Sequence, residues 1–421
     1  MTKIKIGFLG LGVVGAELVN IIQQAHDRIL EKYEIDLVIG EVFVRDLNKK
    51  RGTNVGLLKL TTNPDDIIFD KDTDIVCECI GGAGSELTYN YVTAAIKQGK
   101  SIVMSSKKAL ALYAKEILNN IQSSTALLRY DATVGGGIPI EKIFANSFFG
   151  EKITKITAIV NATSNYIYTK MSTEKAIFEE ALKNAQICGY AENDPSDDIL
   201  SYDALYKTVI LSTFGMDKYF SPIDLEIVPF SNVTVEDINF SSKLGYSIKP
   251  IIHIEDVDDI LLYLIGPCLI NKRDIIANTF ENNNIIKVKG DLSGSLAFYG
   301  QGAGNKPTAS AMFDDIMSII KCEKNMFEYD RTNNKLCDSL VKKKETMQYL
   351  RFHRCDKLQS QKDFIQLLKE NNVNVCDCCY IEEQNNDDIA IIVKSSDDFD
   401  CILNEIQANW RIVSNFPVLE D

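Results

Sequence analysis

No apolar run in the sequence is long enough to cross a membrane. A membrane-spanning helix needs about 20 predominantly apolar residues, whereas the longest apolar stretch, residues 260–270, is much shorter and contains Gly266 and Pro267. The N-terminus also lacks the apolar core and the cleavage site of a secretory signal, because residues 1–6 run directly into a strand pattern. We therefore expect a cytoplasmic protein without a membrane partner.

A disulfide framework and an excess of positive charge are absent as well. The 11 cysteines follow no regular spacing, which in a cytoplasmic chain indicates reduced thiols. Cys376, Cys378 and Cys379 lie close together, but no second pair of ligands elsewhere in the sequence completes a zinc site. The formal net charge of −14 argues against nucleic acid as a partner.

The composition is that of an ordinary globular protein, with 45% hydrophobic and 25% charged residues. At about 150 residues per domain, the length of 421 residues corresponds to roughly three domains. Within residues 1–130, helical patterns alternate with strand patterns at 4–9, 35–44, 73–80 and 101–104. This alternation predicts an α/β domain with a doubly wound parallel sheet of the Rossmann type.

The first strand leads into a glycine-rich turn that is typical of a dinucleotide-binding site. Its glycines, Gly10-x-Gly12-x-x-Gly15, stand directly before a helical pattern. This context gives a tight turn, lets the backbone approach a pyrophosphate and places phosphate at a helix N-terminus. Because ligands of such sheets bind at the carboxyl ends of the strands, we assign cofactor binding to Gly10, Leu11, Gly12, Val13, Val14, Gly15, Gly81, Gly82 and Ser105.

The end of the second strand bears on the choice of cofactor. An acidic residue at this place binds the ribose 2′-hydroxyl of NAD, whereas an arginine accommodates the 2′-phosphate of NADP. The strand ends in Arg45, which Asp46 follows. Arg45 favours NADP, and Asp46 keeps NAD open as the alternative.

An acid-rich segment, residues 189–198, precedes a helical pattern that carries Asp203 and Lys207 one turn apart. Its carboxylates can hold a substrate ammonium group. Equally, they can be helix N-terminal acids that interact with the helix dipole, beside an ordinary ion pair. A lysine in a partly dry pocket can exchange a proton with an alkoxide, a step that carbonyl reduction requires. Lys207 and Lys108 are the candidates for this step.

The chain beyond residue 130 predicts two further units. Residues 131–304 contain a Gly-rich loop, helical patterns and a later set of strands, which indicates an α+β domain. A helix at about 305–321 is expected to return to the first domain, and the polar residues 322–345 are expected to form a linker. Residues 346–421 have the order βαββαβ, which is typical of a ferredoxin-like sandwich.

Together these motifs resemble those of homoserine dehydrogenases. The resemblance extends through most of residues 1–320 and is strongest in the acid-rich segment, where Asp198, Asp203 and Lys207 keep the family's spacing. It implies an oxidoreductase that interconverts L-aspartate 4-semialdehyde and L-homoserine with NAD(P)H, in the biosynthesis of threonine, methionine and isoleucine. A dehydrogenase of another small aldehyde or amino acid and a catalytically silent amino-acid sensor are the alternatives.

The resemblance also implies that the α+β domain, residues 131–304, binds the substrate and forms the dimer, and it implies roles for single residues. Lys207 and Lys108 match the pair that transfers a proton and holds the substrate, with Asp203 as their acidic partner. Lys108 and Gly302 are also assigned to the cofactor. The residues assigned to the substrate and its amino group are Glu192, Asp198, Thr163, Tyr190 and Ala162. The departures from the family pattern are Ala162 and Ser201, which replace glycines, and Lys107, which stands where Asn is common.

A monovalent cation, Na⁺ or K⁺, is a further implication of the resemblance. The implied ligands are Asp131 and the backbone carbonyls of Val134, Gly136 and Ile138. Hard cations take oxygen ligands of this kind. Asp131 is one methylene shorter than the glutamate that is usual at this position, so a plain tight glycine turn is the alternative interpretation.

The terminal unit, residues 346–421, resembles an ACT domain, which binds amino acids and permits feedback inhibition, typically by threonine. The usual glycine in the turn after its first strand is absent from residues 355–360, and without glycine the backbone approaches a ligand less freely. Effector binding and a purely dimerising role are therefore both open. We expect a homodimer or a homotetramer.

Overall fold

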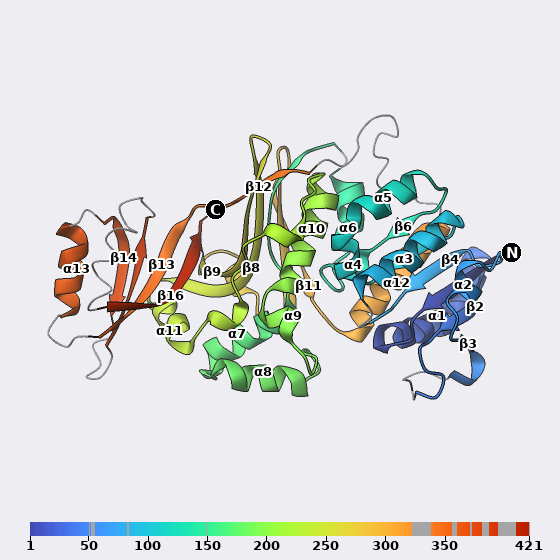
Figure 1. Ribbon diagram of the computed structural model, residues 1–421, viewed down its shortest axis with the longest axis horizontal. Helices are drawn as coiled ribbons and strands as arrows, with labels where there is room; N and C mark the ends of the chain where they lie inside the picture. Colours follow the sequence, from blue (N-terminus) through green and yellow to red (C-terminus); the bar gives the residue numbers. More distant parts are fainter. Residues whose placement is uncertain are drawn as a thin grey trace.

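The computed structural model is elongated, with three regions along its long axis (Figure 1). It describes residues 1–49, 51, 55–81, 84–148, 150–321, 338–355, 360–370, 373–380, 387–394 and 410–420. The N-terminal sheet lies at one end, a long sheet occupies the middle, and the C-terminal unit lies at the other end. Within the described ranges, no helix is both long and apolar enough to cross a membrane.

The N-terminal sheet has six parallel strands in the order β3-β2-β1-β4-β5-β6. The strands are β1 (Thr2–Leu9), β2 (Ile35–Phe43), β3 (Lys59–Thr61), β4 (Ile75–Glu78), β5 (Ser101–Met104) and β6 (Leu128–Arg129). The helices along this part of the chain are α1 (Val13–Tyr33), α2 (Asp65–Ile68), α3 (Ser85–Lys97), α4 (Lys107–Leu112) and α5 (Ala114–Gln122). The strand order is that of a Rossmann sheet, so the predicted fold class is confirmed.

Two features of this domain refine the expectation. The segment after β5 forms two short helices, α4 and α5, which meet at Tyr113. Helix α12 (Asn305–Ile320) returns to the sheet from far along the sequence. Its residues Met312 and Ile316 are fully buried in one apolar cluster with Phe8 of β1 and Leu18 of α1.

The middle region is built on antiparallel strands in the order β11-β10-β7-β8-β9. They are β7 (Ile153–Ile159), β8 (Tyr246–Val257), β9 (Ile260–Asn271), β10 (Asn283–Gly290) and β11 (Gly294–Gln301). The accompanying helices are α6 (Ile140–Ser147), α7 (Ala162–Glu174), α8 (Phe178–Ile187), α9 (Ser196–Ile199), α10 (Tyr202–Met216) and α11 (Val235–Lys243). Helix α10 packs against both β8 and α4, so it joins the middle region to the N-terminal domain.

The terminal unit contains β13 (Met347–Arg354), α13 (Gln361–Glu370), β14 (Val375–Tyr380), β15 (Asp388–Val393) and β16 (Trp410–Leu419). Its strands pair antiparallel in the order β16-β13-β15-β14. β16, the last strand of the expected βαββαβ order, also pairs in parallel with β9, so the terminal unit extends the middle sheet. The second helix of that order, expected at residues 399–408, lies outside the described residues.

The expected linker, 322–345, is only partly described, because residues 322–337 lie outside the described ranges. Its last part is not a free connection. Residues Leu340–Lys343 form β12, which pairs in parallel with β9 through backbone hydrogen bonds. Of the polar residues that indicated a linker, Lys342 and Lys343 belong to this strand. The division into domains remains a prediction.

Candidate active site

The glycine-rich turn between β1 and α1 has the shape that a dinucleotide requires. Gly10 has a φ of 104°, and a Cβ atom there would lie 2.4 Å from the carbonyl oxygen of Cys79. A Cβ atom at Gly15 would lie 2.9 Å from the carbonyl oxygen of Gly10. At Gly12, by contrast, the space is open, and Val13 at the start of α1 is 65% exposed. The start of α1 is therefore accessible to a phosphate group.

The other residues assigned to the cofactor surround this turn. The backbone N–H of Gly10 donates to the carbonyl of Phe43 at 3.1 Å, which places the turn beside the end of β2 and the exposed Arg45. Ser105 follows β5 and Gly81 follows β4, at the same edge of the sheet. Gly302 packs against the loop at Gly136. Gly82 lies outside the described residues. A role of these residues in cofactor binding remains a prediction.

Asp203 on α10 is the centre of a buried polar network. The Nζ atom of Lys207, one turn further along, lies 2.9 Å from Asp203 Oδ2 and donates to the carbonyl of Val160 at 2.6 Å. The same Oδ2 atom accepts a hydrogen bond from Asn161 Nδ2 at 2.9 Å. Asp203 is 1% exposed and Lys207 is 8% exposed. The pair is thus a buried one and not the ordinary surface pair that its spacing also allows.

Asp198 on α9 joins this network through Asn161. Asn161 Nδ2 donates to Asp198 Oδ1 at 2.8 Å, and Thr163 Oγ1 donates to the other carboxylate oxygen at 3.1 Å. Asn161 is also the N-cap of α7, because its Oδ1 atom accepts the backbone N–H of Ser164 at 2.7 Å. One side chain therefore begins α7 and holds two carboxylates. Sequence analysis did not assign it, although Asn between a strand and a helix is a recognised capping signal.

The second lysine of the network is Lys107 and not Lys108. The ammonium group of Lys107 forms an ion pair with Asp203 Oδ1. Lys108 is exposed, and its Nζ atom lies 5.5 Å from the centre of the Tyr206 ring. The expectation that Lys108 shares Asp203 is therefore wrong. Consecutive residues on a helix point in different directions, so only one of the two lysines reaches Asp203 from the start of α4.

Burial and these charges shift the protonation equilibria of the site. Burial opposes ionisation of Asp203, but the ammonium groups of Lys107 and Lys207 outweigh it and hold the pKa of Asp203 below its usual value. Burial lowers the pKa of Lys207, and the like charge of Lys107 lowers it further against the attraction of Asp203. For Lys107, the attraction of Asp203 and Asp198 outweighs burial and raises the pKa. Lys207 is therefore the lysine of the pair that gives up a proton more readily.

The remaining residues assigned to the substrate lie around Thr163. The hydroxyl of Thr163 also donates to the carbonyl of Tyr190 at 2.8 Å, and Ala162 is buried at the first position of α7. Glu192 is exposed, and within the described ranges its carboxylate is not part of the network. The structure thus brings Asp198, Thr163 and Tyr190 together and leaves the exposed Glu192 outside the network.

Ser201, which replaces a glycine usual in the resembled family, directly precedes α10. Its φ of 69° lies in the left-handed region, where glycine is unstrained and other residues are not. Its Oγ atom donates to the carbonyl of Val228 at 2.7 Å, and the residue is fully buried. This hydrogen bond offsets part of the strain and fixes the start of the helix that carries Asp203 and Lys207.

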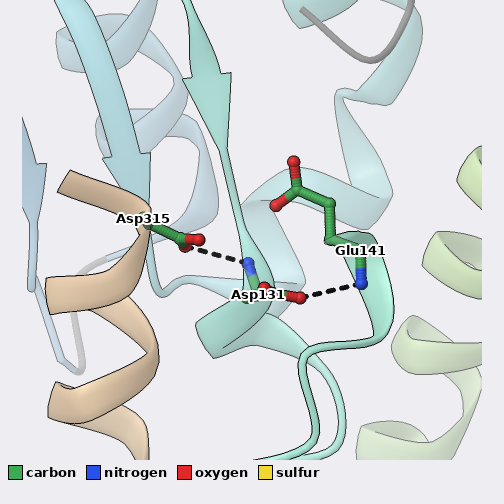
Figure 2. Close-up of side chains that lie close together, drawn as sticks. All are labelled: Asp131, Glu141 and Asp315. Atoms are coloured by element: carbon green, nitrogen blue, oxygen red, sulfur yellow. Dashed lines mark hydrogen bonds between the residues drawn. The ribbon is translucent and has the colours of Figure 1, made fainter. Parts of the chain in front are cut away.

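Asp131 belongs to a second buried cluster, which Figure 2 shows. Asp131 Oδ1 accepts the backbone N–H of Glu141 at 2.7 Å, and the backbone N–H of Asp131 donates to Asp315 Oδ2 at 3.1 Å. One carboxylate oxygen from each of the three residues lies within 4.8 Å of the others. Lys142 Nζ lies 3.4 Å from Asp131 and 3.2 Å from Asp315. Burial, followed by the charge of Asp131, raises the pKa of Asp315 to about 7.

The cluster supplies oxygen atoms of the kind that a hard cation binds. Glu141 Oε1 is buried without a hydrogen-bond partner, whereas Asp131 Oδ2 and Asp315 Oδ1 face the ammonium group of Lys142. The carboxylates are ligands of the right kind for such an ion, but Lys142 already supplies one positive charge among them. Sequence analysis assigned Asp131 but not Glu141 or Asp315. No local pattern marks them, because Asp315 comes from α12, 184 residues along the chain from Asp131.

Comparison with known proteins decides the family. A family model described as "Homoserine dehydrogenase" matches residues 139–317, and one described as "Homoserine dehydrogenase, NAD binding domain" matches residues 10–131. The homoserine dehydrogenase of Bacillus subtilis is 32% identical over 99% of both chains. The chain belongs to the homoserine dehydrogenase family. It is therefore an NAD(P)-dependent oxidoreductase that acts on a CH–OH group, as predicted.

Solved structures of homoserine dehydrogenases have the same fold. That from Thiobacillus denitrificans is 29% identical, with a TM-score of 0.87, and the match covers 100% of this chain and 99% of that one. A homoserine dehydrogenase structure from S. aureus is 28% identical, with a TM-score of 0.81 and complete coverage of both chains. A hyperthermophilic archaeal homoserine dehydrogenase in complex with NADPH, at 22% identity and a TM-score of 0.63, shares the fold over 77% of this chain.

Proposed function

We propose that the chain catalyses the reversible reduction of L-aspartate 4-semialdehyde to L-homoserine and that Lys207 exchanges the proton with the substrate oxygen. Membership in the homoserine dehydrogenase family supports the reaction. The role of Lys207 is supported by its buried ion pair with Asp203 on α10, a helix that packs against α4 of the N-terminal domain.

A bound nicotinamide cofactor supplies the hydride, and the glycine-rich turn fits its pyrophosphate. Reduction of the aldehyde leaves negative charge on the substrate oxygen, which an adjacent ammonium group stabilises and then protonates. Lys207 suits this step because its lowered pKa eases proton release. In the oxidation of homoserine, neutral Lys207 takes up the hydroxyl proton. Asp203 and the carbonyl of Val160 hold the Nζ atom in place.

The amino group of the substrate is assigned to Asp198, with Glu192 at the rim. Asp198 is positioned by two side-chain hydrogen bonds, from Asn161 and Thr163. A fixed, partly buried carboxylate binds an ammonium group strongly, because water competes weakly there. Tyr190 and Ala162 border this pocket in the proposal.

NADP is the proposed cofactor. Arg45 is exposed at the end of β2, beside the glycine-rich turn. The alternative NAD ligand, Asp46, uses one carboxylate oxygen to accept the backbone N–H of Asn48 at 2.8 Å. The NADPH bound by the archaeal homoserine dehydrogenase gives further support.

We also propose a monovalent cation near Asp131, with the carbonyls of Val134, Gly136 and Ile138 as further ligands. The buried carboxylate of Asp131, which lies beside those of Glu141 and Asp315, supports this proposal. Such an ion would supply positive charge that stabilises the loop.

We propose a cytoplasmic location for the protein. The cysteines whose side chains the structure describes are free thiols, the form that a reducing compartment maintains.

We further propose self-association and an effector site. β11 is the outer strand of the middle sheet and exposes Leu296 and Tyr299, by 40% and 59%. An open strand edge with apolar side chains suits pairing with a second copy. The terminal unit is proposed to be ACT-like and either to bind threonine or to serve assembly. Gel filtration and inhibition by threonine test these two points.

The absorbance of the reduced cofactor tests the function directly. Wild-type protein is expected to oxidise L-homoserine with NADP, and other small amino alcohols and alcohols much more slowly. Lys207→Met should lower kcat by about 10²–10⁴, as the loss of a proton-transfer group does. The matched control is Lys183→Met, a change at an exposed lysine of α8. No preference for homoserine would refute the reaction, and a fully active Lys207→Met variant would refute the role of Lys207.

A further inference from the structure

A lysine side chain reaches from the surface into the buried carboxylate cluster of Figure 2. The cluster consists of Asp131, which follows β6, Glu141 on α6 and Asp315 on α12. Lys142 places its ammonium group 3.4 Å from Asp131 Oδ2 and 3.2 Å from Asp315 Oδ1. We propose that Lys142 is a built-in substitute for the monovalent cation, which occupies the cluster when no ion is bound and leaves it when an ion binds. This inference rests on the proposed cation and adds the residue that competes with it.

The cluster requires positive charge because water is nearly excluded from it. Asp131, Glu141 and Asp315 are 1%, 2% and 0% exposed, and one carboxylate oxygen of each lies within 4.8 Å of the others. Carboxylates this close together do not all ionise without a counter-charge. Arg129 contributes one such charge near Glu141. Arg129 is fixed in place, because it is fully buried and its Nε atom donates to Ser318 Oγ at 3.0 Å.

Lys142 differs from Arg129 because its charged group can leave the cluster. Its side chain is 21% exposed, so it extends from solvent to the buried acids. Both of its ion-pair distances are longer than the value of about 2.8 Å that is usual between an ammonium group and a carboxylate. The helix dipole also opposes Lys142, which lies in the first turn of α6. The attraction of two acids therefore holds its ammonium group, without a short hydrogen bond to either acid.

An ammonium group and a hard monovalent cation suit the same place. Each carries a single positive charge in a compact form and is surrounded by oxygen atoms. The flexible stem of Lys142 lets its ammonium group turn towards water while α6 stays where it is. An ion that enters has to displace this group, so its apparent affinity is lower than the carboxylates alone would give. A protein built in this way tolerates the absence of Na⁺ and K⁺.

Thermal unfolding at constant pH and ionic strength tests this proposal, with choline chloride as the salt without a hard cation. Lys142→Met should unfold at a lower temperature than the wild type in choline chloride. NaCl or KCl should raise its unfolding temperature in a saturable way, on the order of 3 °C at about ten times the dissociation constant. The ion concentration at half effect should be at least about tenfold higher in the wild type, where Lys142 competes for the site.

Two further variants make this experiment specific. The double variant Lys142→Met/Asp315→Asn removes one charge of each sign, and it should lose most of the response to Na⁺ and K⁺. The matched control is Lys183→Met, a change at an exposed lysine of α8, which should behave as the wild type does in all three salts.

Each outcome decides the role of Lys142. If Lys142→Met unfolds at the same low temperature in all three salts, or folds in none of them, no ion replaces the ammonium group and the proposal is overturned. If Na⁺ and K⁺ stabilise the wild type and Lys142→Met with the same half-effect concentration, the cation stands and the role of Lys142 falls. A wild-type protein that fails to oxidise homoserine would instead refute the proposed function, while the unfolding series still decides the role of Lys142.

Discussion

Asp203→Asn is the most informative single change to the site, because it removes one charge and keeps the shape of the side chain. Asp203 is fully enclosed and contacts Lys107, Lys207 and Asn161. The amide of the new residue can still accept a hydrogen bond, but it cannot balance two ammonium groups. The change therefore leaves two like charges facing each other across a neutral group.

The structure sets the size of the expected effect. Loss of one partner of a buried ion pair costs about 3–5 kcal/mol. The side chain of Lys107 is 38% exposed and can turn towards water, so we expect the lower end, about 3 kcal/mol of unfolding free energy. Lys207 loses the anion that holds it, so kcat should fall by about 10²–10⁴. Removal of a nearby anion also lowers the pKa of Lys207, so the rising limb of the pH profile should move to lower pH.

Steady-state oxidation of homoserine and thermal unfolding measure these effects together. The matched control is Asp197→Asn, an exposed acid on α9, which should retain wild-type values in both measurements. If Asp203→Asn keeps the kcat and the unfolding temperature of the wild type, the buried network does not organise catalysis, and the reasoning fails.

Three further predictions concern other parts of the chain. Asn161→Ala should lower stability by about 1 kcal/mol through loss of the N-cap and should also lower kcat, whereas Asn161→Ser should restore the unfolding temperature but not the activity. Arg45→Ala should raise KM for NADP about tenfold, as loss of a charge-assisted hydrogen bond does, and an unchanged KM would contradict the proposed NADP site. Burial lowers the pKa of Lys249 from 10.5 to about 8, so the unfolded chain binds more protons between these values and folded stability rises with pH there. Lys249→Met should remove this rise in melting curves recorded at a series of pH values. At neutral pH it should raise the free energy of unfolding by up to about 3 kcal/mol, less the contribution of the lost hydrogen bond to the carbonyl of Thr279.

The Rossmann half could be predicted from the sequence because its signals are local. Gly10, Gly12 and Gly15 lie between the end of β1 and the first turn of α1. Nearby backbone leaves no room for a Cβ atom at Gly10 and Gly15, whereas the space at Gly12 is open. The acid-rich segment is local too, and Asp203 and Lys207 stand one turn apart on a single helix. Periodicity and spacing are sufficient for features of this kind.

Features that depend on distant parts of the chain could not be predicted in this way. The choice between Lys107 and Lys108 depends on where α4 begins, which Ser106 and Glu78 determine together. Asp315 reaches Asp131 only because α12 returns to the first sheet. The strand hidden in the expected linker, β12, exists because β9 offers it hydrogen-bonding partners. In each case the deciding contact joins segments that no local pattern connects.

The pairing of β9 with both β12 and β16 has a consequence for any shortened form of the protein. β9 has 12 residues and a largely buried, apolar sequence, and two strands from beyond residue 338 cover its side away from β8. A chain cut before β12 would leave the N–H and C=O groups of that long apolar strand open to other molecules, which favours aggregation. β12 and β16 thus shield the edge of β9, and a truncation before residue 338 would expose it.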